Sequence, residues 1–305
     1  MLKISHIPNS KLYVSEPDPR WFGNPSNEPN NPSWGVESKN WLKSRFHFSF
    51  AEYSNQRNSN FGVLRVMNDD FVQPDRGFGT HGHANMEIVT YIVDGNLTHR
   101  DSMGTDETLG RGSVQFMTAG RGVRHSEFNL EKDKSLRFIQ TWIVPRRSGL
   151  NPNYGSFNPS NGGDNNESQV FTARNQWRHL VSDMQDNSTT TPVQIEQDAN
   201  LFVAELDIGS CLTLKMKKNR MAYILCAEGC VRVGTAGCDD ALLHQHDGCE
   251  VTPTPTAADS IYEIHNLVFE AAKSLSSADG GAGSDAAHIL VFEMENVPGA
   301  GRTDL

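Results

Sequence analysis

Long apolar runs are missing from this sequence. No stretch approaches the roughly 18 apolar residues that a membrane-spanning helix requires. The first nine residues, MLKISHIPN, contain one lysine but no continuous apolar segment after it, which argues against a secretory signal. Both absences predict a cytoplasmic protein, with a nuclear location also open if the source is eukaryotic.

Positive charge is also scarce. The chain has 27 Lys and Arg residues against 37 Asp and Glu residues, so its formal net charge is −10. Binding to a nucleic-acid backbone or to an anionic membrane surface requires clustered positive side chains. The charge balance therefore argues against both as direct partners.

Cysteine is absent from the first two thirds of the chain. The five cysteines are Cys211, Cys226, Cys230, Cys238 and Cys249. An odd number in this arrangement argues against a disulfide framework and for a reducing compartment. The last four are spaced by 4, 8 and 11 residues, unlike the paired knuckles of a zinc site. We expect buried, reduced thiols in strands.

Helical periodicity of useful length is likewise missing, and short strand-like runs take its place. β-Branched and aromatic residues concentrate in segments such as 62–67, 86–93, 113–117 and 136–144, which are separated by turn signals such as Asn68-Asp69-Asp70 and Asp94-Gly95-Asn96. This alternation is typical of an antiparallel sandwich or barrel. We therefore predict an all-β fold.

A polar, Gly- and Asn-rich stretch at residues 149–168 divides the chain, and strand-like runs resume after it. We predict an N-terminal domain over 1–148, a linker over 149–168 and a C-terminal domain over 169–305, the two domains being antiparallel β-barrels (jelly rolls). Residues 15–40 should form an extended surface segment and residues 273–287 a surface loop. Two halves of similar size suggest a duplicated barrel, although no sequence identity links them.

Two short pairs of metal-ligand type stand out. Alternate residues of a strand point to one face, so His81 and His83 can project together into a barrel interior, and Glu87 shares their parity. His125 and Glu127 form a second pair. Each pair alone is more often a hydrogen-bonded or surface feature. The two together, both flanked by Gly-rich turns, favour one metal site.

The donor set has a defined chemistry. Imidazole nitrogen suits Fe, Zn, Cu and Ni, and a carboxylate adds a harder oxygen donor. Three neutral imidazoles and one carboxylate leave a divalent ion with a net charge of about +1. Four protein ligands in octahedral geometry leave two positions open, as in reactive rather than structural sites. Non-haem Fe(II) oxygenases use a related set of two histidines and one carboxylate.

Longer stretches around these pairs identify a family. They are residues 41–53, 61–70, 81–91, 95–104, 114–127 and 140–145. In these stretches the chain resembles the pirin family of the cupin superfamily, and within it the bacterial members described as quercetin 2,3-dioxygenases. The resemblance is strong over about residues 41–158 and fades in the second half.

The resemblance implies a bicupin fold with one divalent metal ion in the N-terminal domain and none in the C-terminal domain. It places the metal ligands at His81, His83, His125 and Glu127. Glu87 would lie beside the ligands. Fe(II) is the metal that the resemblance favours, with Cu, Ni, Zn and Mn left open. Gly82 departs from the family, which usually has proline there, and glycine loosens the backbone between the first two histidines.

The resemblance also implies an oxidoreductase, a metal-dependent dioxygenase that opens the ring of a flavonol such as quercetin with O2. Glu127 would then be the catalytic base as well as a ligand. The alternative is a non-enzymatic, iron-binding and redox-sensitive regulator that binds a transcription-related partner. A third class is a bicupin whose metal is purely structural.

Other motifs are assigned no ligand. His244-Gln245-His246 precedes an Asp-Gly turn and has no His-x-Glu pair after it, which predicts a solvated loop. His99 and Asp101 lie beside a turn and are interpreted as structural. The Gly-Phe-Gly run at 77–79 has no helix after it, so it is not a phosphate-binding loop.

Overall fold

The computed structural model describes residues 2–18, 21, 41–159, 174–235, 240–254, 264–273 and 286–296. Within these ranges strands are the main secondary structure, and the named helical elements there are two short 3-10 turns, Asn9–Lys11 (η1) and Gln56–Asn58 (η4). The predicted all-β fold is confirmed. Most of the predicted segments 15–40 and 273–287, and also Cys238, lie outside the described residues. No helix in the described part of the chain has both the length and the apolar character needed to cross a membrane.

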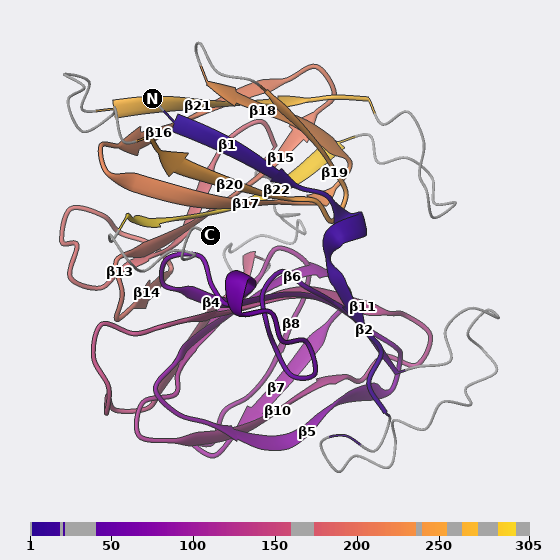
Figure 1. Cartoon of the computed structure of the whole chain (residues 1–305). Coiled ribbons are helices and arrows are strands. Elements are labelled where there is room, and N and C mark those ends of the chain that lie inside the picture. The colour runs from indigo at the N-terminus through magenta and orange to yellow at the C-terminus, as the bar shows by residue number, and fades with distance from the viewer. Residues whose placement is uncertain are drawn as a thin grey trace, which may run out of the picture.

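The strands form two stacked domains, each made of a seven-stranded and a four-stranded sheet (Figure 1). In the N-terminal domain the larger sheet has the order β12-β9-β6-β11-β4-β3-β2 and the smaller one the order β5-β10-β7-β8. The bounds are β2 (Tyr13–Ser15), β3 (Leu42–Phe46), β4 (Leu64–Val72), β5 (Arg76–His83), β6 (Glu87–Asp94), β7 (Leu97–Asp101), β8 (Asp106–Leu109), β9 (Val114–Thr118), β10 (Val123–Asn129), β11 (Leu136–Ile143) and β12 (Asn153–Phe157).

The C-terminal domain repeats this plan with sheets β1-β20-β17-β22-β15-β13-β14 and β16-β21-β18-β19. Its strands are β1 (Leu2–Ile7), β13 (Arg178–Asp183), β14 (Val193–Ile195), β15 (Ala199–Asp207), β16 (Cys211–Lys217), β17 (Arg220–Glu228), β18 (Cys230–Thr235), β19 (Ala241–His244), β20 (Gly248–Pro253), β21 (Ile264–Ala271) and β22 (Ala286–Glu295). The two predicted jelly-roll domains are therefore present, as sandwiches of two sheets rather than as closed barrels.

Two strands lie across the predicted domain boundaries. The N-terminal strand β1 pairs with β20 over its whole length, so residues 2–7 complete the C-terminal sheet, where β1 is the indigo strand of the upper domain in Figure 1. Strand β12 falls inside the predicted linker and pairs with β9 at the edge of the N-terminal sheet. The polar composition of residues 149–168 gives no strand signal for β12, because an edge strand needs only one apolar face.

The interiors of the two sandwiches differ. The C-terminal interior is filled by apolar side chains such as Ile224, Val231 and Phe269, which are fully buried. The N-terminal interior has a smaller apolar cluster around Trp41 and Phe138 at one end. The N-terminal domain also buries polar and ionisable side chains such as His125, Glu127 and Asn68, so this is where a site can form.

A third core joins the two domains. On β6 the odd residues Val89 and Tyr91 face the C-terminal domain, where they pack in one cluster with Tyr223 and Phe292 of the opposing sheet. Strand alternation therefore sends neighbouring residues of the seven-stranded sheet into different cores. The same alternation decides which residues reach the N-terminal interior.

Candidate metal centre

Three predicted histidines converge on the inner face of the four-stranded N-terminal sheet. His81 and His83 lie two residues apart on β5, and His125 on β10 pairs directly with His81 in the antiparallel ladder. Directly paired residues have neighbouring side chains on one face. A register shift in β10 between His125 and Glu127 marks a bulge, a feature that commonly re-aims side chains at functional sites.

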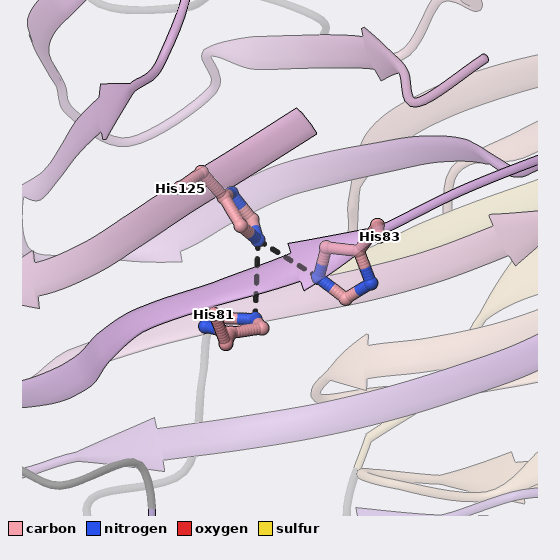
Figure 2. Close-up of side chains that lie close together, drawn as sticks. All are labelled: His81, His83 and His125. Atoms are coloured by element: carbon pink, nitrogen blue, oxygen red, sulfur yellow. Dashed lines mark hydrogen bonds between the residues drawn. The ribbon is translucent and has the colours of Figure 1, made fainter. Parts of the chain in front are cut away.

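The imidazole nitrogens point toward one another (Figure 2). The Nε2 atom of His125 lies 2.9 Å from Nε2 of His83 and 3.2 Å from Nε2 of His81. Nitrogen ligands at about 2.1 Å from a metal ion and at right angles to each other are separated by about 3.0 Å. The three nitrogens therefore already have the spacing of adjacent metal ligands.

His83 and His125 have the protonation state that cation binding requires. Nδ1 of His81 donates a hydrogen bond to the Gly79 carbonyl oxygen at 2.8 Å, which orients the ring so that its Nε2 faces Nε2 of His125. Burial, together with the neighbouring His125 and His81, lowers the pKa of His83 to about 3. Burial, with His81 and His99 nearby, lowers the pKa of His125 to about 2. At neutral pH both rings are uncharged, as metal ligands must be.

Glu127 is held by two carboxamides. Gln115 Nε2 donates to one carboxylate oxygen at 3.1 Å, and Gln140 Nε2 donates to the other at 2.7 Å. The indole N–H of Trp142 in turn donates to Gln140 Oε1 at 3.2 Å. A carboxylate offers about four lone-pair positions, so two remain for other partners. Sequence reasoning missed both glutamines, because a lone amide carries no motif.

His99 is a fourth histidine in this cluster. It is buried beside His125, with ring centroids 5.3 Å apart, and its Nε2 lies 3.1 Å from the Asp101 carboxylate. Donor atoms of His99, His125 and Glu127 lie within 4.8 Å of one another. His99 and Asp101, for which we predict a structural role, therefore lie next to the candidate ligands. The sequence alone could not predict this position, because it depends on the pairing of β7 with β10.

Two expectations are wrong. Glu87 shares the parity of His81 and His83, but the turn at Asn85 (φ +54°) separates β5 from β6. Parity does not carry through a turn, and Glu87 lies on the side of β6 that faces the C-terminal domain, where its carboxylate accepts a hydrogen bond from Thr118 Oγ1 at 2.8 Å.

The predicted solvated loop at His244–His246 is the other correction. His244 is exposed, but His246 is only 7% exposed, and its Nδ1 lies 2.6 Å from the carboxylate of Asp69. Asp69 also forms a two-point salt bridge with Arg137. The partners of His246 lie more than 100 residues away, so local composition could not predict its burial.

A cavity of about 300 Å³ opens beside the histidines. Its walls are mostly apolar, and an edge-to-face series runs from Phe46 to Phe50, Trp142 and His83 with centroid distances of 5.3, 5.2 and 4.8 Å. The volume lies at the lower end of the roughly 300–1,000 Å³ found for small-molecule sites. A flat aromatic ligand fits such walls better than a polar one.

Two other features compete with this site and are weaker. A cavity of about 520 Å³ in the C-terminal domain is lined by charged groups, but Arg220 there already pairs with Asp198 and Glu293. Glu205, Glu228 and His288 lie close enough to hold a metal ion. However, the Arg111 guanidinium occupies their centre, 2.8 Å from Glu205 and 2.6 Å from Glu228.

Fold and site together define a bicupin with a histidine-rich centre in its N-terminal domain. A family model described as pirin matches residues 30–143, and one described as quercetinase C-terminal cupin domain matches residues 180–270. A pirin-like protein of Caulobacter vibrioides is 39% identical over 235 residues, which cover 77% of this chain and 94% of that protein. The chain belongs to the pirin family.

Other relatives agree with this assignment. A quercetin 2,3-dioxygenase of Escherichia coli is 44% identical over 120 residues, which cover 39% of this chain and 52% of that protein. The crystal structure of YhhW from Escherichia coli superimposes with a TM-score of 0.65 at 26% identity, covering 94% of this chain and 98% of that one. A structure of bacterial pirin YhhW in complex with nickel(II) gives a TM-score of 0.68 at 23% identity, covering 97% and 100% of the two chains.

Proposed function

We propose that His81, His83, His125 and Glu127 hold one divalent metal ion, with Fe(II) as the native metal. The observation that carries this proposal is the convergence of three imidazoles, in which the Nε2 atoms of His83 and His81 lie 2.9 and 3.2 Å from Nε2 of His125, beside a carboxylate fixed by two amides. The nickel(II) complex of a bacterial pirin with the same fold supports a divalent ion.

We further propose that the protein is a dioxygenase that opens the ring of a flavonol such as quercetin with O2. The name of the Escherichia coli relative and the match to a quercetinase domain support this substrate class. When bound, the metal ion supplies Lewis acidity to a ligand hydroxyl and, as Fe(II), a redox partner for O2.

The protein's own groups then perform binding, orientation and proton transfer. The aromatic walls at Phe46, Phe50 and Trp142 hold a flat ligand and exclude water from the histidine side of the cavity. Glu127 has lone-pair positions beyond those used by Gln115 and Gln140, so one oxygen can accept the proton of the flavonol 3-hydroxyl while the other serves as a ligand.

The test is elemental analysis of protein purified without added metal, followed by oxygen uptake and absorbance measurements with quercetin on the same sample. We expect about one metal ion per chain and consumption of O2 together with loss of the flavonol absorbance. Glu127→Gln should abolish turnover, because an amide cannot accept the proton. Metal-loaded protein that consumes no O2 with quercetin would refute the enzymatic proposal and favour the regulatory alternative.

A further inference from the structure

The cavity wall opposite the histidines carries a row of four polar residues, of which the proposed chemistry uses only Gln140. It belongs to the seven-stranded sheet, in which Asn68 and Asp70 are alternate residues of β4. Ser44 of β3 pairs with Asp70, and Gln140 of β11 pairs with Asn68. All four side chains line the 300 Å³ cavity.

This row is deeply buried and incompletely bonded. Asn68 is 4% exposed and Asp70 is 3% exposed. The Oδ1 atom of Asn68 has no hydrogen-bond partner among the described residues. A buried polar atom without a partner is unfavourable, so a ligand that satisfies it gains affinity.

Asp70 has different neighbours from the adjacent Asp69. Asp69, on the other face of β4, is paired with Arg137 and His246. Burial raises the pKa of Asp70 to about 8, a hydrogen bond with Ser44 opposes this rise, and the acidic neighbours Asp69 and Glu127 add to it. At neutral pH Asp70 therefore carries a proton that it can donate to an oxygen.

We infer that Asn68 and Asp70 form a hydroxyl-binding subsite, which selects a planar phenolic ligand with hydroxyl groups on the ring that does not face the histidines. This inference rests on the proposed function, because it names the part of the same cavity that chooses among flavonols. Asn68 Oδ1 accepts from one ring hydroxyl and Asp70 donates to another, while the aromatic walls hold the ring between them.

Two flavonols test the subsite with the metal-loaded full chain. Quercetin has two hydroxyls on its pendant ring, and galangin has none. We expect the wild-type protein to bind quercetin at least fivefold more tightly than galangin, since the two neutral hydrogen bonds together contribute roughly 1–3 kcal/mol. Affinities measured anaerobically by quenching of tryptophan fluorescence do not depend on turnover.

Substitutions of Asn68 and Asp70 test whether these two residues cause the preference for quercetin over galangin. Asn68→Leu should lower the affinity ratio at least about twofold with unchanged metal content, because it removes one of the two hydrogen bonds, whereas Asp70→Asn, which keeps a donor, should preserve the ratio. Asn153→Leu, on the exposed side of edge strand β12, is the matched control and should leave the ratio unchanged. The wild-type comparison decides the matter even if Asn68→Leu fails to fold.

The outcomes separate this inference from the proposed function. Turnover of both flavonols with equal affinity would overturn the subsite and leave the dioxygenase intact. A preference for quercetin that depends on Asn68, without any oxygen uptake, would overturn the enzymatic proposal and keep the subsite. Failure of the metal-loaded protein to bind either flavonol would overturn both.

Discussion

At the scale of single residues, the histidine cluster depends on burial. Three imidazoles within hydrogen-bond distance of one another repel if they are protonated, and burial keeps His83 and His125 neutral. Their Nε2 atoms converge, and in the tautomer with the proton on Nδ1 the Nε2 lone pairs would face a common point without a compensating charge. A cation at that point removes the mismatch, which is the physical reason to expect metal rather than a purely structural cluster.

Replacing His125 by alanine should therefore abolish metal binding, because His125 contacts both other imidazoles and its loss removes the central nitrogen donor of the three. We expect the metal content measured by elemental analysis to fall from about one ion per chain to below a tenth, with loss of any flavonol turnover. His244→Ala, at an exposed position of the C-terminal domain, should keep the full metal content. Metal that persists without His125 would refute the ligand assignment.

Glu87 gives a second prediction at this scale. Burial at the domain junction, with Glu196 nearby, raises its pKa from 4.5 to about 7. Between these values the unfolded chain loses the proton and the folded chain keeps it, so stability is greatest below about pH 4.5 and decreases as the pH rises to about 7. Glu87→Gln removes this loss and retains an acceptor for Thr118.

We expect Glu87→Gln to be more stable than wild type by about 1–3 kcal/mol at pH 8 and by much less at pH 5, as measured by urea unfolding at both pH values. Glu295→Gln, at an exposed position, should show no such difference between the two pH values. A gain at pH 5 equal to that at pH 8 would contradict a buried, protonated Glu87.

At the scale of elements, strand alternation explains both the successes and the failures of sequence reasoning. It brought His81 and His83 to one face because both lie on β5. It failed for Glu87, because the residues between β5 and β6 turn the chain and reset the parity. The convergence of His125 with His81 depends on the pairing of β10 with β5, which the family resemblance implied and alternation alone could not.

Site residues that belong to no chemical motif could not be identified from the sequence. Gln115 and Gln140 act only because β9 and β11 bring them to the two oxygens of Glu127. Asn68 and Asp70 read as an ordinary polar turn signal in the sequence, yet they lie in the middle of β4. Buried polar side chains in a β-strand are invisible to hydrophobic periodicity, since they interrupt the pattern that defines the strand.

Substitution of Gly82 tests whether β5 needs a glycine between His81 and His83 to position the two histidines. Its φ is not in the left-handed region, and an added Cβ would meet its nearest neighbour, the Val123 carbonyl oxygen, at 3.7 Å. Gly82→Ala should therefore raise the free energy of unfolding by about 0.4–1 kcal/mol, through the entropy of the unfolded chain, and leave metal content unchanged.

Gly95→Ala is the contrasting variant for this comparison. Gly95 has φ +80°, and an added Cβ would overlap the Ser135 carbonyl oxygen, so this change should destabilise the protein. Chemical denaturation of both variants checks the pair of predictions. Loss of metal in Gly82→Ala would show that the glycine is required by the site rather than tolerated there.

At the scale of the whole molecule, the two domains are joined by more than a linker. His47 Nδ1 lies 2.8 Å from the Tyr223 hydroxyl, and Tyr91 hydroxyl lies 2.9 Å from His288 Nε2, all four being buried. The Arg111 guanidinium crosses to two glutamates of the C-terminal domain. Separating the domains would expose these groups and the shared apolar core, so we expect them to unfold as one unit.

Metal binding in the N-terminal domain should therefore protect the C-terminal domain. A ligand at 100 times its Kd adds about 2.7 kcal/mol to stability, which slows amide exchange through global unfolding by about 100-fold. With saturating Ni(II), hydrogen exchange of β17 and β22 should slow by about this factor, although neither strand carries a candidate ligand. The His125→Ala protein should show no slowing with Ni(II). Slower exchange confined to β5 and β10 would mean that the C-terminal domain opens independently, and that the contacts across the interface are too weak to couple the two halves.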